Sequence, residues 1–350
     1  MQSETRLDAR FVLRVVAAGL ISACWLQPAV AVASSDPALD PAEAQAQASW
    51  RADIARIEVP ADGCFQAAYP NLYWERVACR VGQPRSHSVP PKVKEGGSDV
   101  VGNGYDYAAL VTGLISKADG SFPSVTGVTH EQSAGVPAFG DGGELGPNEY
   151  SLQVNTNYTG TTAACQGHSG CVVWQQFIYA TDQINENEGA AFMQYWLLGW
   201  GDTACPAGFF SDDDSGDCYT NSNAVIVPDV KITHFADETI TGSAVSGGND
   251  TVRFTHNDHS YSVSGLDSML DIATVWNEVE FNVVGDGGGS RADFNKGSSI
   301  TVDLAVTSGS SAKPTCKKKA GSTGETNTLD LGPCTASGGA TPAIEFTESN

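Results

Sequence analysis

Three stretches of the sequence place amide or carboxylate side chains inside otherwise apolar, strand-like runs. They are Trp174-Gln175-Gln176-Phe177, Phe192-Met193-Gln194-Tyr195-Trp196 and Glu278-Val279-Glu280-Phe281-Asn282. A carboxylate can take a proton from an attacking water, and an amide can donate its N–H groups to a developing oxyanion. One carboxylate and one amide could therefore hydrolyse a polar bond without a metal ion or a nucleophilic side chain.

The third stretch alternates polar and apolar side chains, as a strand with one polar face does. Glu278, Glu280 and Asn282 would then share that face. The simpler explanation is a polar side of an antiparallel sheet that faces solvent. The alternative is a groove for an extended polymer, lined by side chains of all three stretches. On that hypothesis the groove contains Trp174, Gln194, Trp196, Glu278 and Asn282.

Other chemical motifs are weak or absent. The sequence has no P-loop and no G-x-S-x-G pattern. His256 and His259 form an H-x-x-H pair that lacks the glutamate of a zinc protease, and no cysteine pair has the C-x-x-C spacing of a zinc site. Residues 212–217 are acidic but lack the ligand order of an EF-hand. We therefore expect no metal and no other cofactor.

The composition excludes several classes of function. The 350 residues include 41 acidic and 19 basic side chains, a formal net charge of −22. Phosphate backbones and anionic membranes repel such a surface, so we expect no nucleic-acid partner. Charged residues make up only 17% of the chain while glycine reaches 38 residues, which argues against a helical bundle.

Short strand-like runs separated by turn residues fill the sequence from about residue 100 onward. Many of them alternate with period two and are rich in β-branched or aromatic residues, for example residues 150–156 and 278–284. Asp267–Trp276 is the one clear helix expected among them. The sequence therefore predicts an all-β fold over residues 100–350, an antiparallel β-sandwich or jelly roll with one short helix.

Residues 1–33 have the three parts of a secretory signal peptide: early arginines, an apolar run, and a small-residue cleavage site at Ala31-Val32-Ala33. The apolar run is shorter than the ~20 residues of a membrane span. Cleavage there predicts a secreted, extracellular protein with no membrane partner. The alternative is a lipoprotein anchored through Cys24 in Ile21-Ser22-Ala23-Cys24.

Cleavage after residue 33 would remove one of the nine cysteines and leave eight. An even number of cysteines in an exported chain indicates disulfides. The eight fall into four pairs that are close in sequence, and we predict that each pair is bonded. The pairs are Cys64–Cys79, Cys165–Cys171, Cys205–Cys218 and Cys316–Cys334.

Residues 34–95 are predicted to form a separate N-terminal segment. It starts with an Ala-rich stretch at 37–57 whose acids come early and arginines late, as in a helix. A small cysteine-closed part follows at 58–80, and a linker containing Pro and Gly follows at 81–99. The segment is either a pro-segment removed by proteolysis, which would make the chain a zymogen, or a permanent accessory arm.

The order of the motifs resembles that of the glutamic peptidases, most closely the eqolisins of fungi, over about residues 104–306. Asp106-Tyr107-Ala108-Ala109 resembles the first eqolisin strand, Asn-Trp-x-Gly, and Val125-Thr126-Gly127-Val128 resembles the next, V-x-G-x-[FV]. The run from Tyr150 to Asn155 stands where that family has W-V-G-I-D-G. The three stretches described first resemble, in order, the strand with the catalytic Gln, an aromatic W-Y-E-W-Y strand, and the strand with the catalytic Glu.

This resemblance implies an endopeptidase that hydrolyses peptide bonds with a Glu/Gln pair. Glu280 would be the catalytic carboxylate, and either Gln175 or Gln176 would be its amide partner. A glutamate with the ordinary pKa of ~4.3 acts best as a base in acid. The resemblance therefore implies a secreted, acid-acting hydrolase.

The neprosin family is a second, looser comparison. Trp174-Gln175 matches its Gly-Trp-Gln motif, but its catalytic Glu would then fall near Val172, which has no ionisable side chain. Glu280 is therefore the better-supported assignment.

We expect a monomer that acts on a polypeptide substrate. The alternative is a non-catalytic secreted β-sandwich that binds glycan or a surface polymer. In that case sugar rings would stack on aromatic side chains such as Tyr150, Trp174, Tyr179, Tyr195, Trp196 and Trp200.

Overall fold

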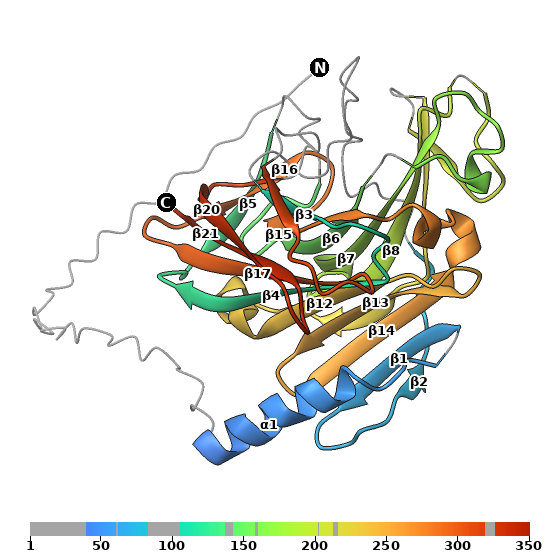
Figure 1. The fold of residues 1–350 in the computed structure, drawn as a ribbon. Helices are drawn as coiled ribbons and strands as arrows, with labels where there is room; N and C mark the ends of the chain where they lie inside the picture. The colour runs from blue at the N-terminus through green and yellow to red at the C-terminus, as the bar shows by residue number, and fades with distance from the viewer. Residues whose placement is uncertain are drawn as a thin grey trace, which may run out of the picture. The chain divides into compact units, whose positions relative to one another are not determined.

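The structure is a computed structural model that describes residues 40–60, 62–82, 106–136, 143–157, 160–201, 203–212, 216–318 and 326–350. Antiparallel strands dominate these residues, as the sequence predicts (Figure 1). The predicted signal peptide, the alternative lipid site at Cys24 and residues 83–99 of the linker lie outside the described residues. No helix in the described ranges is long and apolar enough to cross a membrane.

The first sheet has nine strands in the order β2-β1-β14-β13-β12-β4-β17-β21-β20. Their bounds are β2 Glu75–Val77, β1 Gly63–Ala68, β14 His259–Leu266, β13 Asn249–His256, β12 Glu238–Ser243, β4 Lys117–Thr126, β17 Ser299–Thr307, β21 Ala343–Ser349 and β20 Asp330–Ser337.

The second sheet runs β18-β3-β15-β6-β7-β8-β10-β9, with β11 also paired to β8. Its strands are β18 Thr315–Lys318, β3 Tyr107–Leu110, β15 Glu278–Gly285, β6 Tyr150–Thr156, β7 Val172–Asn185, β8 Glu188–Leu198, β10 Asp217–Asn221, β9 Phe210–Asp212 and β11 Val225–Pro228. A small third sheet joins β19 Thr326–Asn327, β16 Ser290–Phe294 and β5 Glu131–Gly135.

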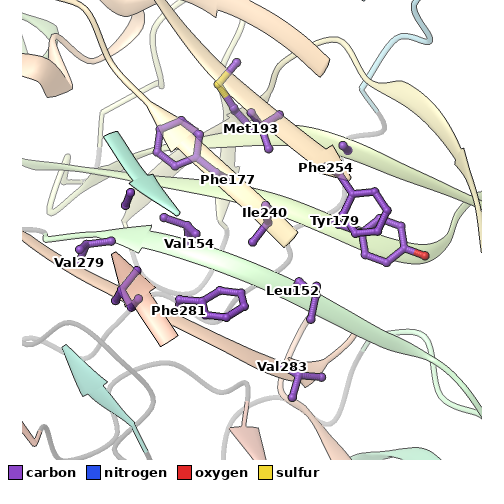
Figure 2. Close-up of a cluster of buried hydrophobic side chains, with 14 of the residues drawn as sticks. Leu152, Val154, Phe177, Tyr179, Met193, Ile240, Phe254, Val279, Phe281 and Val283 are labelled. Carbon is purple, nitrogen blue, oxygen red and sulfur yellow. The ribbon is translucent and has the colours of Figure 1, made fainter. Parts of the chain in front are cut away.

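The main core lies between the first and second sheets. The Tyr179 ring of β7 stacks on Phe254 of β13 with their centroids 3.9 Å apart (Figure 2). Phe281 of β15 packs against Phe122 of β4, with ring centroids 5.0 Å apart. Gly120 of β4 makes room for this packing, because a Cβ atom there would lie 2.3 Å from the Phe281 ring. One face of the second sheet is thus committed to the core, and its other side chains point away from the first sheet.

The helix predicted within residues 37–57 is present as α1, Pro41–Ile54. Arg253 of β13 donates to the carbonyl oxygens of Ala55 at 2.8 Å and Ile57 at 3.2 Å, just beyond the helix, where a cation suits the helix dipole. The chain then enters β1, which pairs with β14 along six residues. The N-terminal segment therefore extends the first sheet at its edge.

The helix expected at Asp267–Trp276 is wrong. Two short 3-10 turns stand there instead, Asp267–Met269 and Ile272–Thr274. Asp271 between them has a left-handed φ of 55°, which ends the first turn before a helix can continue. The Asp267 carboxylate accepts a hydrogen bond from the backbone N–H of Ala273 at 3.1 Å, and this bond connects the two turns.

All four predicted disulfides are confirmed: Cys64–Cys79, Cys165–Cys171, Cys205–Cys218 and Cys316–Cys334. Each closes a loop of at most 18 residues. The Cys64–Cys79 bond lies within the N-terminal segment, so it does not tie that segment covalently to the two large sheets.

Candidate active site

A row of polar side chains crosses the second sheet on the face away from the first sheet. The strand registers place Glu280 of β15 opposite Asn155 of β6, and Asn155 opposite Gln176 of β7. Gln176 is in turn opposite Gln194 of β8, which is opposite Asn221 of β10. We call these five residues the polar row. Cross-strand partners point to the same side of a sheet, so the row forms one continuous polar line.

The two candidate glutamines point to opposite sides of the second sheet, because successive side chains of a strand alternate. Gln175 shares the core side with Phe177 and Tyr179, and its Nε2 lies 3.7 Å from the Met193 sulfur. Gln176 lies on the outer side together with Glu280. Of the two glutamines, only Gln176 therefore shares the face of Glu280.

Glu280 and Gln176 are separated by one intervening strand, β6, which puts their Cα atoms about 10 Å apart at the usual strand spacing. Both side chains are long enough to reach toward each other above Asn155. Asn155 Nδ2 donates to Gln153 Oε1 at 3.3 Å and lies 3.5 Å from Glu280 Oε2. Gln176 Nε2 donates to the same Gln153 oxygen at 2.9 Å.

Trp196 fixes the orientation of the Gln176 amide. Its indole Nε1 donates to Gln176 Oε1 at 3.1 Å and to Gln194 Oε1 at 3.0 Å. An indole can only donate, so the oxygen of Gln176 must face Trp196. The N–H₂ group of Gln176 then faces Gln153 and the Glu280 side of the row.

The other predicted groove residues lie on the same outer face. Trp174 pairs with Trp196 across β7 and β8, with ring centroids 6.2 Å apart, and Tyr219 of β10 follows at 5.0 Å from Trp196. At the opposite end, Lys317 of β18 forms an ion pair with Glu278 at 3.2 Å. Aromatic rings thus line one side of the polar row.

Asn282 hydrogen-bonds to two carboxyl groups from distant parts of the chain. Its Nδ2 donates to Asp106, just before β3, and to Glu348 of β21 at 2.6 Å. Asn327 Nδ2 donates to the second Glu348 oxygen at 3.0 Å. Asp106 also lies within hydrogen-bond range of Glu280. The site therefore contains three carboxyl groups in close succession.

This carboxyl cluster favours protonated forms. Burial, and then the neighbouring Glu280 and Glu348 charges, raise the pKa of Asp106 well above its usual range. Burial, together with the Glu280 charge, raises the pKa of Glu348 to about 8, although its bonds to Asn327 and Asn282 oppose the shift. No three His, Cys, Asp or Glu side chains of the described ranges are grouped so that they could hold a metal ion.

Sequence reasoning missed five residues of the site: Gln153, Asn155, Asn221, Asp106 and Glu348. The first two alternate with buried apolar residues in β6, which was a usable signal. Asp106 and Glu348 carry no local signal, because long-range pairing alone brings them to β15.

Comparisons with known proteins leave the chain unassigned to a family. No protein-family model matches it, and no curated protein sequence matches it. The chain is similar in structure to scytalido-glutamic peptidase bound to a transition-state analog inhibitor, with 10% identity, 69% of this chain and 97% of that chain covered, and a TM-score of 0.33. It is also similar to SCP-B, an eqolisin-family peptidase in complex with the tripeptide Ala-Ile-His, with 10% identity, 69% and 96% coverage, and a TM-score of 0.26.

A third similar structure is the κ-carrageenase of Pseudoalteromonas carrageenovora in complex with an oligotetrasaccharide of κ-carrageenan. The two chains are 5% identical, the match covers 84% of this chain and 97% of the carrageenase chain, and the TM-score is 0.24. At such TM-scores the likeness assigns no activity to this chain, so its function has to be argued from its own residues.

Proposed function

We propose that this chain is a secreted, acid-acting endopeptidase of the glutamic type, with Glu280 as the base and Gln176 as its amide partner. The observation that carries the proposal is the polar row, which sets one carboxylate and one amide on the same face of one sheet, two strands apart. Gln153 and Asn155 link them through hydrogen bonds. The sequence resemblance to the eqolisins implies Glu280 together with either Gln175 or Gln176.

In the proposed reaction, the Glu280 carboxylate takes a proton from a water molecule as the water oxygen attacks the peptide carbonyl carbon. Gln176 Nε2 donates a hydrogen bond to the carbonyl oxygen as it becomes negatively charged. Glu280 then returns the proton to the leaving amine as the C–N bond breaks. Trp196 keeps the amide of Gln176 turned the right way throughout this sequence.

Access to the site requires a change of conformation, because Glu280 is only 2% exposed and Gln176 is fully buried. We infer that the chain is a zymogen in which residues 34–95 are a pro-segment and the 81–99 linker is the cleavage region. The local Cys64–Cys79 bond allows this, since a cut in the linker would leave the segment held by non-covalent contacts, among them those with β14, Arg253 and Ala224.

The alternative, glycan binding, has less support from the geometry. Three of the aromatic side chains that could stack on sugars face the inter-sheet core instead: Tyr150, Tyr179 and Tyr195. Trp174 and Trp196 lie on the outer face and, like Glu280 and Gln176, are almost fully buried, so sugar stacking on them would need the same change of conformation.

The direct test is digestion of an unfolded protein substrate between about pH 2.5 and 7, a span that brackets the ordinary glutamate pKa. A metal chelator and a serine-protease inhibitor are present throughout, and the chain is tested intact and after cleavage of the linker. We expect cleavage in the acid part of the range, and more of it from the cut chain. If neither form cleaves the substrate at any pH while glycan arrays retain the protein, the binding alternative replaces the peptidase.

A further inference from the structure

The resemblance to the eqolisins leaves Asp106 without a role, because that family has Asn at the corresponding position of its first strand. In this chain the residue is a carboxyl group with 1% exposure. It stands just before β3, two residues before Ala108, which pairs with Glu280. Asp106 is therefore a second acid beside the proposed base.

We propose that the Asp106–Glu280 pair holds one proton and that this proton is on Asp106. Asp106 then positions Glu280 and keeps it in the ionised form that activates water. This inference rests on the proposed peptidase function and adds a residue to it. Asp106 does not touch the substrate in this scheme, so it acts as a positioning residue.

The hydrogen bonds around Asp106 show where the proton belongs. Asn282 donates to Oδ1 of Asp106, and that oxygen therefore acts as an acceptor. Oδ2 is buried and receives no hydrogen bond from any N–H or O–H group of the described residues. Two ionised carboxylates in contact repel each other and have no proton to bond through. A proton on Oδ2 removes the repulsion and turns Asp106 into a donor toward Glu280.

The surrounding charges favour the same arrangement. Glu348 of β21 lies on one side as a further buried carboxyl group, and its two oxygens accept hydrogen bonds from Asn282 and Asn327. On the other side, Lys317 of β18 forms an ion pair with Glu278, which lies two residues from Glu280 in β15. The charge of this lysine is therefore already paired. Burial and the neighbouring carboxylates raise the pKa of Asp106, which keeps its proton in place at acid pH.

The consequence is a wider acid range for the enzyme. A hydrogen bond donated to a carboxylate favours its charged form and lowers its pKa. Glu280 therefore stays ionised at a lower pH than it would beside an apolar residue. During hydrolysis Glu280 gains the water proton and passes it to the leaving amine, while the Asp106 proton stays where it is.

The test is the pH profile of kcat/KM for Asp106→Asn and Asp106→Ala beside the wild type. Asn fits the same hydrogen bonds, since its oxygen accepts from Asn282 and its N–H₂ group donates to Glu280. We expect Asp106→Asn to keep the acid limb of the profile, and Asp106→Ala to move it upward by about one pH unit. Mere structural damage would lower activity at every pH without moving the limb.

A second readout does not depend on activity. The infrared difference spectrum of wild type minus Asp106→Asn at pH 6 should contain one protonated carboxyl band. If the acid limb lies at the same pH in all three proteins, or if the band is missing, the proposal falls while the peptidase function stands. If the wild type hydrolyses no peptide, the peptidase function falls, and the infrared band alone decides whether the proton is carried by Asp106.

Discussion

Replacing Glu280 with Gln is expected to lower peptide hydrolysis at pH 4 on the order of 10³-fold, because a positioned general base contributes about 10²–10⁴-fold. The substitution keeps the size and polarity of the side chain, and Asn155 can still bond to the new amide. Folding should therefore be unaffected. The measurement is kcat/KM with a peptide substrate, together with the melting temperature of each protein.

The matched control is Glu278→Gln, the same substitution two residues away on the same face of β15. Glu278 is paired with Lys317 at 3.2 Å and has no role in the proposed reaction. We expect this variant to lose less than about 10-fold, the order expected for one hydrogen bond or ion pair. Equal losses in the two variants would mean that the face as a whole is needed and that Glu280 has no special role.

Stability should fall as the pH rises from about 4 to 8, because several carboxyl groups are buried or half-buried and carry raised pKa values. Burial is the largest cause for each of them. The pKa is about 9 for Glu131, about 8 for Glu149, Asp250 and Glu348, and about 7 for Asp229.

The sign follows from proton uptake. A carboxyl group with a raised pKa holds its proton in the folded state but releases it in the unfolded state once the pH exceeds about 4. The contribution of such a group to the free energy of unfolding is therefore complete below about pH 4, and it is lost as the pH rises through 7 to 9. Together these groups should lower the free energy of unfolding by a few kcal/mol between pH 5 and pH 8. A loss of this size corresponds to a fall of roughly 10 °C in the melting temperature.

The half-buried cluster of Glu149, Asp182 and Asp229 offers a variant for this test. Asp182 hydrogen-bonds to both neighbours, and these bonds lower its own pKa although desolvation opposes the shift. The double variant Glu149→Gln/Asp229→Asn keeps donors toward Asp182 but cannot ionise, so the fall in melting temperature should become smaller. Asp53→Asn, a change of an exposed carboxylate on α1, should leave the fall unchanged. A wild-type melting temperature that stays constant or rises from pH 5 to pH 8 would contradict this account.

The sequence predicted those features of the fold that depend on local pattern. The strands around the site were recognised because their side chains alternate, and β6 was predicted with its observed bounds, Tyr150–Thr156. The cysteine pairs were predicted from their short separations. The helix predicted within residues 37–57 has the expected order of charges, with Glu43 in the first turn and Arg51 in the last.

The remaining features depend on pairing between distant strands. Alternation alone could not say which of two adjacent glutamines faces Glu280, because that choice needs the register of β6 between β15 and β7. Asp106 and Glu348 are far apart in the sequence, and only the strand order brings them to Asn282. The false helix at Asp267–Trp276 arose because its apolar spacing suits buried turns as well as a helix.

The central claim, that Glu280 acts with Gln176 on the outer face of the second sheet, is tested most directly by one substitution made at two adjacent positions. Gln176→Met and Gln175→Met both remove an amide and keep the side-chain volume. The measurement is kcat/KM at pH 4 per folded molecule. We expect Gln176→Met to lose about 10²–10³-fold, as for the loss of an oxyanion donor, and Gln175→Met to lose little activity. Equal activity in Gln176→Met and the wild type, or a large loss confined to Gln175→Met, would contradict the account.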